Sequence, residues 1–242
     1  MLKAVIFDCD GVIVNSEPHH LKGFQMVLAE EGIALSLEEY NKTYLAMDDK
    51  GCFETILAVH HRPTDKATIK RLIHTKMAIY KKLSEQECYI YPGVFELVKA
   101  LEGKVKLAIA SGAFRGEIKS ALDRANIRSA FPIIVSAQDV KQGKPHPEAF
   151  LTALAKINAI YRQTTPSPSL TKEGDSPLIN PSECVVIEDS LHGVGAAKAA
   201  GMKSVAVTNS YSRDMLLPLA DWVVESLTEV HREALERLCK TN

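Results

Sequence analysis

Two carboxylates that lie two residues apart follow the first apolar run of the chain. The run Ala4–Phe7 leads directly into Asp8-Cys9-Asp10-Gly11. At the end of a buried strand, one aspartate can attack a phosphorus atom, and a second can exchange a proton with the leaving group and then with water. The same four residues also fit a loop or a helix cap with solvated carboxylates, so this motif alone does not decide between these readings.

Two further apolar runs end in groups that complement these carboxylates. One run ends in Ser111-Gly112, where a hydroxyl and backbone amides at the start of a following helix suit a phosphate oxygen. Another ends in Glu188-Asp189, which supplies the carboxylates that a Mg²⁺ ion requires in addition to Asp8. Because the carboxyl ends of parallel strands share one edge of a sheet, we expect these groups to converge.

A lysine in a rigid turn completes the set. Lys144 lies in Gly143–Pro147, which precedes another predicted helix, and it is placed to neutralise both the nucleophile and a phosphoryl group. Nucleophile, acid/base, anion donor, cation and metal ligands are the parts that phosphoryl transfer needs. The four motifs together therefore favour that chemistry over solvated carboxylates.

The four motifs resemble those of the haloacid dehalogenase-like superfamily, and the resemblance spans nearly all of the chain. The matching residues are Asp8-Cys9-Asp10-Gly11, Ser111, Lys144-Pro145 and Glu188-Asp189. The resemblance implies a Rossmann-like core, a helical cap inserted after the first motif, and an aspartyl-phosphate intermediate on Asp8. It also implies that Mg²⁺ is held by the Asp8 carboxylate, the Asp10 backbone carbonyl and Asp189, with Glu188 near or in the coordination shell.

Within the superfamily, the residues around the first motif narrow the comparison. Asp10–Ile13, followed by Ser16-Glu17 and His20, looks like the subgroup that contains β-phosphoglucomutase and small sugar-phosphate or phosphoglycolate phosphatases. The presence of Asp10 disfavours carbon–halogen chemistry, because dehalogenases of the superfamily lack that second aspartate.

The choice between phosphatase and mutase rests on departures from the mutase pattern. Similar mutases carry an Arg and a Lys-Gly pair in the cap, where this chain has Leu45–Lys50, and Ser and Asn after the second motif, where it has Ala113 and Arg115. We therefore expect a phosphatase that acts on a small phosphorylated metabolite. A phosphosugar mutase is the alternative among enzymes, and a catalytically silent binding protein with this fold is the alternative outside them.

Three further residues are candidates for substrate binding beside Gly112. By resemblance, His20 could form a hydrogen bond near the cap hinge and Asp10. Arg115 and Lys50 could face a cleft between core and cap where substrate is closed off from water. For each of the three, an exposed position on a helix is the competing interpretation.

The elements that must position these residues are short apolar strands separated by helix-length amphipathic segments. The predicted strands are Ala4–Phe7, Val105–Ala110, Ile133–Val135, Cys184–Ile187, Ser204–Val207 and Trp222–Val224. This alternation predicts an α/β fold, a Rossmann-like parallel sheet with crossover helices. The long interval between the first two strands has no convincing strand of its own, which indicates a folded insertion.

The content of that interval predicts an inserted α-helical cap domain. The expected helices are Leu21–Glu31, Leu37–Leu45 behind Ser36, Gly51–Val59, and Lys66–Leu83 behind Thr64 or Asp65. The domains are then a core of residues 1–16 and 90–242 and a cap of residues 17–89. A stretch rich in Pro, Ser and Thr at residues 162–180 is predicted to be a flexible loop insertion in the core.

Composition excludes several other classes of protein. A net charge of -1 gives no field that would gather nucleic acid or anionic lipid. No apolar stretch is long enough to span a membrane, and the first residues lack a signal-peptide layout, so we expect a cytoplasmic protein, as a monomer or weak homodimer. The five cysteines are scattered without a CxxC pair, which disfavours a zinc site or a disulfide framework.

Overall fold

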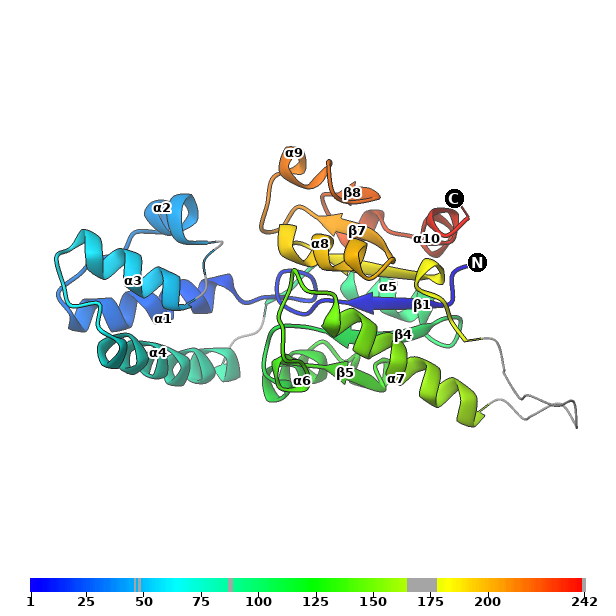
Figure 1. Ribbon diagram of the computed structural model, residues 1–242, viewed down its shortest axis with the longest axis horizontal. Coiled ribbons are helices and arrows are strands. Elements are labelled where there is room, and N and C mark those ends of the chain that lie inside the picture. Colours follow the sequence, from blue (N-terminus) through cyan, green and yellow to red (C-terminus); the bar gives the residue numbers. More distant parts are fainter. Residues whose placement is uncertain (46, 48, 87–88, 165–177, 241–242) are drawn as a thin grey trace, which may run out of the picture. The chain divides into compact units, whose positions relative to one another are not determined.

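The computed structural model describes the chain except for residues 46, 48, 87–88, 165–177 and 241–242 (Figure 1). It divides into two compact units. The core unit comprises Met1–Asn15 and Ile90–Asn242, and the helical unit comprises Ser16–Tyr89. Most of the predicted loop insertion at 162–180 lies outside the described residues.

A six-stranded parallel sheet forms the centre of the core unit, which confirms the predicted fold class. In spatial order its strands are β5 (Ile133–Val135), β4 (Lys106–Ala110), β1 (Ala4–Phe7), β6 (Cys184–Glu188), β7 (Lys203–Val207) and β8 (Trp222–Val224). The chain runs outward from β1 through β4 to β5, and then crosses to β6 on the other side of β1. The order of the strands thus reverses beside β1, and in open α/β sheets such a switch point is where ligands bind.

Helices cover both faces of the sheet, which is why its strands are almost continuously apolar. Helices α7 (Glu148–Thr164) and α8 (Leu191–Ala199) pack on the face that carries Ala4 and Ile6. Helices α5 (Val94–Leu101) and α10 (Arg232–Leu238) lie on the opposite face (Figure 1). The remaining helical segments of the core unit are α6 (Arg115–Arg124), α9 (Arg213–Leu216), η2 (Arg128–Ala130), η3 (Ala137–Asp139), η4 (Pro181–Glu183) and η5 (Leu227–Glu229).

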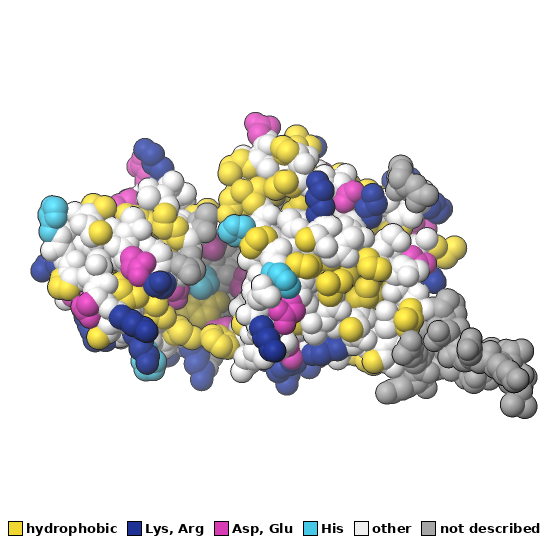
Figure 2. Space-filling view, in the orientation of Figure 1, with side chains coloured by type: hydrophobic (Ala, Val, Ile, Leu, Met, Phe, Trp, Pro, Cys, Tyr) yellow, Lys and Arg dark blue, Asp and Glu magenta, His cyan; other side chains and the backbone are white. Residues whose placement is uncertain are grey.

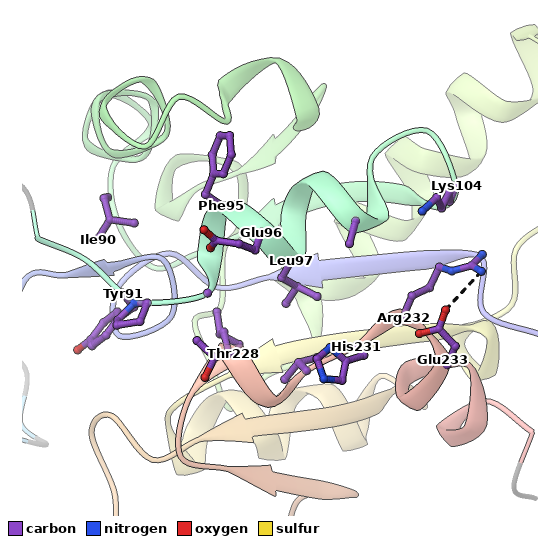
Figure 3. Close-up of a pocket in the computed structure, with 15 residues that line it drawn as sticks. Ile90, Tyr91, Phe95, Glu96, Leu97, Lys104, Thr228, His231, Arg232 and Glu233 are labelled. Carbon is purple, nitrogen blue, oxygen red and sulfur yellow. Dashed lines mark ion pairs between the residues drawn. The ribbon is translucent and has the colours of Figure 1, made fainter.

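An open hollow separates α5 from the segment that runs from η5 into α10 (Figure 3). Phe95 and Leu97 of α5 contribute apolar surface, whereas His231, Arg232 and Glu233 line the opposite side. Arg232 and Glu233 form an ion pair with 3.6 Å between Nη2 and Oε1. Both sides of the hollow are mixed, because Glu96 and Lys104 also line it on the α5 side and Leu227 and Val230 on the other.

The helical unit has an apolar core of its own. Its helices are α1 (Glu17–Glu30), α2 (Leu37–Glu39), the π-helix η1 (Tyr40–Tyr44), α3 (Asp49–Val59) and α4 (Lys66–Gln86). Large side chains from several of them are almost fully buried together, among them Phe24, Phe53, Leu57 and Leu72. Two short strands, β2 (Val14–Asn15) and β3 (Tyr89–Ile90), pair where the chain leaves and re-enters the core unit.

Several helix boundaries in this unit differ from the predictions, since α3 begins at Asp49 rather than Gly51 and α4 ends at Gln86 rather than Leu83. Helix α1 begins at Glu17 rather than Leu21, because Pro18 lies in the first turn, where proline has no helical hydrogen bond to break. Ser36 caps the next helix through the Glu39 N–H at 3.1 Å, as predicted. That helix, however, widens into a π-helix at Tyr40 instead of continuing to Leu45 as one α-helix.

The surface mixes charges of both signs. On the face in Figure 2, Lys and Arg side chains are interspersed with Asp and Glu, as expected from 29 basic and 30 acidic residues. Apolar side chains gather over α9 in the same view, where Met215 and Leu217 are each 50% exposed. Within the described ranges, no helix combines the length and the apolar character needed to cross a lipid bilayer.

Candidate active site

Asp8 lies at the carboxyl edge of the sheet, one residue after the central strand β1. Its backbone N–H donates to the Ile187 carbonyl at 2.9 Å, and the register of β1 on β6 pairs Phe7 with Ile187. The residues that follow, Asp8 and Glu188, are therefore neighbours across the two strands. Both side chains are buried, Glu188 completely.

Lys144 lies between these two carboxylates. Its Nζ atom is 2.8 Å from Asp8 Oδ1, and it also donates to Glu188 Oε1. The peptide bond that joins it to Pro145 is cis, and the Phe150 ring centroid lies 5.1 Å from the ammonium group. A cation is thus held in direct contact with the predicted nucleophile.

Asp189 completes a group of three buried carboxylates. Asp8, Glu188 and Asp189 each offer an oxygen, and these oxygens lie within 4.8 Å of one another. Oxygen ligands of this kind suit a hard divalent cation. Lys144 contributes one positive charge to a cluster of three acidic groups, so the negative charge of the cluster is not balanced by this lysine alone.

The electrostatics reflect this imbalance. Burial, with further contributions from Glu188 and Asp10, raises the pKa of Asp8 to about 7, although Lys144 opposes the shift. Burial also raises the pKa of Asp189 well above its ordinary value, with Glu188 and Asp8 adding to the effect. Burial favours the neutral amine of Lys144, but Asp8 and Glu188 outweigh it and raise the lysine pKa. Additional positive charge would stabilise the ionised carboxylates.

The end of β6 and the start of α8 hold Glu188 in place. Its Oε2 accepts hydrogen bonds from the backbone N–H groups of Asp189 and Ser190, both at 3.1 Å, and from the Ser190 hydroxyl at 2.9 Å. Ser190 in turn caps α8 by accepting from the Gly193 N–H at 3.0 Å. A Cβ atom on Gly193 would lie 1.8 Å from Glu188 Cδ, so only glycine leaves room for this carboxylate.

A tight turn follows Asp8 and presents Asp10. The Cys9 carbonyl accepts from the N–H groups of Ile13 at 2.8 Å and Val14 at 3.0 Å, and the Gly11 N–H donates to the Val14 carbonyl at 2.9 Å. Gly11 has a φ of 76°, a conformation that glycine adopts without strain. Asp10, between Cys9 and Gly11, is partly buried.

The second motif lies at the end of the neighbouring strand β4. Ser111 is buried, and its Oγ accepts from the Ala113 N–H at 3.2 Å. A Cβ atom on Gly112 would meet nothing within 4 Å, so the backbone here borders open space. Arg115 begins α6, but its guanidinium group contacts both Asp139 oxygens, at 2.7 and 2.5 Å. The positive charge of Arg115 is therefore paired with the Asp139 carboxylate, which also belongs to the core unit.

The other two candidate substrate residues belong to the helical unit. Lys50 is exposed, and its Nζ atom lies 3.6 Å from Oε1 of Glu54 on the same helix. His20 Nδ1 lies 2.7 Å from Lys76 Nζ, and this lysine, only 1% exposed, also pairs with Asp49. The Lys76 Nζ atom also lies over the face of the Phe24 ring, 4.3 Å from the ring centroid. Each of these two lysines thus has an acidic partner within the helical unit, Lys76 in a buried pair and Lys50 in an exposed one.

Two residues that we did not predict contact the acid site, by which we mean Asp8, Glu188 and Asp189 together with the turn from Asp8 to Gly11. Asn209 Nδ2 donates to the Gly11 carbonyl at 2.7 Å, and the Ser210 hydroxyl donates to Asp189 Oδ2. Both follow the end of β7. A polar run after an apolar strand was the signal that identified the other motifs, and Thr208-Asn209-Ser210 carries that signal as well.

Comparison with known proteins identifies the family. The model of the haloacid dehalogenase-like hydrolases matches residues 2–201. The chain belongs to this family, as its motifs predict.

Similar proteins include two enzymes named as phosphatases. The chain is 26% identical to the phosphorylated carbohydrates phosphatase of Thermotoga maritima, over 84% of each chain. It is 27% identical to hexitol phosphatase B of Escherichia coli, over 94% of this chain and 93% of that one. Together with the family match, these relatives confirm the prediction of an enzyme of the phosphatase class.

The fold is also that of solved structures. A β-phosphoglucomutase from Clostridium difficile is similar with a TM-score of 0.74 at 23% identity, and the match covers 99% of this chain and 98% of that one. At this level of identity the similarity concerns the fold alone.

Proposed function

We propose that the chain is a Mg²⁺-dependent phosphatase that hydrolyses a small phosphorylated carbohydrate by way of a transient phosphoryl group on Asp8. The observation that carries this proposal is the position of Asp8, buried at the switch point of the sheet between Lys144 and two further carboxylates. The substrate class comes from the relatives named for phosphorylated carbohydrates and for hexitols.

The donor set fits the metal. Asp8, Glu188 and Asp189 would hold the ion, and the resemblance adds the Asp10 carbonyl. Three buried carboxylates with a single lysine among them form a site that a divalent cation stabilises. When bound, Mg²⁺ supplies positive charge against the developing charge of the phosphoryl group.

The residues of the chain divide the reaction between them. In the first step an Asp8 oxygen attacks phosphorus, the bond from phosphorus to the ester oxygen breaks, and Asp10 gives its proton to the departing alkoxide. In the second step Asp10 takes a proton from water while the water oxygen attacks phosphorus. The acyl phosphate bond then breaks, which restores Asp8 and releases inorganic phosphate. Lys144 neutralises Asp8 and the phosphoryl oxygens, and Ser111 donates to one of those oxygens.

The charges of the helical unit favour hydrolysis over mutase chemistry. We propose that this unit acts as the cap that selects the substrate. A mutase must retain a phosphosugar that carries a second phosphate, which calls for free cationic donors. Lys76 is instead buried against Asp49, and Lys50 lies beside Glu54. These pairings support release of the dephosphorylated product and entry of water.

A phosphate-release screen tests the proposal. The purified chain is incubated with phosphorylated monosaccharides and hexitols in Mg²⁺, in excess EDTA, and as the Asp8→Asn variant. We expect at least one substrate to release phosphate, and we expect both EDTA and the nearly isosteric Asn to abolish the release. Full activity in EDTA, or substantial turnover by Asp8→Asn, would contradict the assignment.

A second assay separates phosphatase from mutase. The enzyme is given β-glucose 1-phosphate with a trace of the 1,6-bisphosphate, and glucose 6-phosphate and free phosphate are both measured. We expect little 6-phosphate. If its formation outpaces phosphate release from every monoester tried, the mutase alternative is correct.

A further inference from the structure

The loop that follows β7 forms side-chain hydrogen bonds to both halves of the acid site. Ser210 reaches the carboxylate of Asp189, which follows β6, and Asn209 reaches the carbonyl of Gly11, which follows β1. Two adjacent residues therefore connect the turn that follows Asp8, here called the nucleophile turn, with the carboxylate of Asp189, which is distant in sequence.

The two contacts act on parts of the site that already lie close together. A Cβ atom on Gly11 would fall 1.8 Å from Asp189 Oδ2, so the turn packs directly against this carboxylate. The same Oδ2 accepts the Ser210 hydroxyl. The orientation of the Asp189 carboxyl group is thus set from two sides, by the Gly11 backbone and by Ser210.

We propose that Ser210 and Asn209 are positioning residues for the phosphoryl-transfer site, an inference that rests on the proposed function. Ser210 fixes the rotation of the Asp189 carboxylate, so that its oxygens face the divalent cation. Asn209 holds the Gly11 carbonyl and, through the turn, the backbone that carries Asp8 and Asp10. A hydrogen bond to a ligating carboxylate typically changes metal affinity by about 10- to 100-fold.

The two roles predict different kinetic signatures. Ser210→Ala should weaken cation binding by roughly 10-fold or more, while kcat recovers when the cation is saturating. Ser210→Thr keeps the hydroxyl and should restore the affinity. Asn209→Leu, which is close in volume but has no donor, should lower kcat even at saturating cation, because the nucleophile turn is less well held.

Direct titration with Mn²⁺ gives a readout that does not depend on turnover. Binding to the full-length chain is followed by the loss of the free Mn²⁺ electron paramagnetic resonance signal, without substrate. The matched control is Ser212→Ala, two residues further on, where the side chain is exposed and does not cap α9. We expect wild-type affinity in Ser212→Ala and Ser210→Thr, and weaker binding in Ser210→Ala.

The outcomes separate this inference from the proposed function. Wild-type Mn²⁺ affinity in Ser210→Ala overturns the role of Ser210, even when the protein is an active phosphatase. A lower melting temperature with unchanged Mn²⁺ affinity also overturns it, because that pattern belongs to a purely structural residue. If the wild-type chain binds no Mn²⁺ and releases no phosphate from any substrate, the proposed function itself fails, and this inference fails with it.

Discussion

At the scale of single residues, the acid site requires a glycine beside the buried Glu188 carboxylate, because any side chain there would overlap it. Gly193 lies in the first turn of α8 directly against the Glu188 carboxyl group, and a Cβ atom there would also lie 1.9 Å from Oε1. Glu188 is completely buried and cannot move into solvent. The glycine therefore permits the close approach of a helix to a buried carboxylate.

Gly193→Ala is expected to displace Glu188 and, with it, Lys144. A shift of about 1 Å in catalytic groups can cost roughly 100-fold in rate, so we expect at least that loss in kcat/KM. Gly195→Ala is the control on the same helix, since its nearest neighbour, Pro145 Cβ, is 3.8 Å away. That variant should keep its activity and gain about 0.5–1 kcal/mol in unfolding free energy. Similar rates in the two variants would refute the steric explanation.

Asp10→Asn tests the assignment of the acid. Loss of general acid catalysis should lower the rate on a sugar phosphate by about 10²–10⁴-fold. Para-nitrophenyl phosphate should suffer a smaller loss, because nitrophenolate leaves without a proton. The comparison requires only phosphate-release rates for the two substrates. Equal losses on both would argue that Asp10 acts in another way.

At the scale of elements, the approach of α5 to η5 is closer than any side chain would allow. Gly93 precedes α5 with a φ of 84°, and a Cβ atom there would lie 2.5 Å from the Thr228 backbone nitrogen. Thr228 is one of the residues that line the hollow beside α5 (Figure 3). The nearest atoms are backbone atoms of Leu227 and Thr228, which cannot move aside as the end of a flexible side chain can.

Gly93→Ala should therefore destabilise the core unit more than its conformation alone explains. A left-handed conformation costs a non-glycine residue about 1–2 kcal/mol. Gly103→Ala measures this conformational cost alone, because Gly103 has a φ of 75° and nothing lies within 4 Å of an added Cβ. We expect urea unfolding to show at least about 1 kcal/mol of additional loss in Gly93→Ala. Equal losses in the two variants would mean that the loop relaxes freely.

The helical unit should lose stability in acid because of His20. Burial, followed by repulsion from Lys76 and His19, lowers the pKa of His20 to about 3 from 6.5. The unfolded chain takes up this proton as the pH falls below 6.5, whereas the folded chain does not until about pH 3. Stability is thus retained above pH 6.5 and lost below it, by about 1.4 kcal/mol at pH 5.5.

His20→Gln should flatten this dependence while still accepting from Lys76. The control is His74→Gln, an exposed position on α4 of the same unit. Unfolding free energies at pH 7.5 and 5.5 measure the effect. If His20→Gln loses as much stability in acid as the wild type, another group is responsible.

The elements were largely predictable because both faces of the sheet are buried. Strands such as Ala4–Phe7 read as unbroken apolar runs that end abruptly in polar residues, and their bounds matched the structure to within one residue. The same rule placed Asp8 and Glu188 at one edge, where they are indeed neighbours. The cluster of Lys76, Asp49 and His20 was not predictable, because it joins three helices and leaves no local pattern. A lysine on an amphipathic helix ordinarily indicates a solvated face.

At the scale of the whole molecule, the two units have separate apolar cores, and the acid site belongs to one of them. A ligand stabilises only the folded unit that binds it. Mg²⁺ bound to the core unit as we propose should add about 2.7 kcal/mol at about 100 times its dissociation constant, which corresponds to a shift of roughly 5–10 °C for a unit of this size.

Calorimetry with and without Mg²⁺ checks this expectation. We expect the transition of the core unit to move upward, and that of the helical unit to stay in place. Asp189→Ala should reduce the shift, because the ion loses a carboxylate ligand. A single transition that moves as a whole would show that the two units unfold together.

The position of β1 at the centre of the sheet sets the order in which the chain becomes functional during synthesis. Its partner strands begin at Lys106 and Cys184, so β1 leaves the ribosome long before either neighbour exists. The helical unit, in contrast, is one continuous stretch with its own apolar core, and it can fold as soon as Tyr89 has emerged. The nascent chain thus carries a finished helical unit while four apolar residues of β1 still lack partners. The first neighbour of β1 arrives with β4, and the acid site is complete only with the last third of the chain, which carries Glu188 and Asp189 after β6.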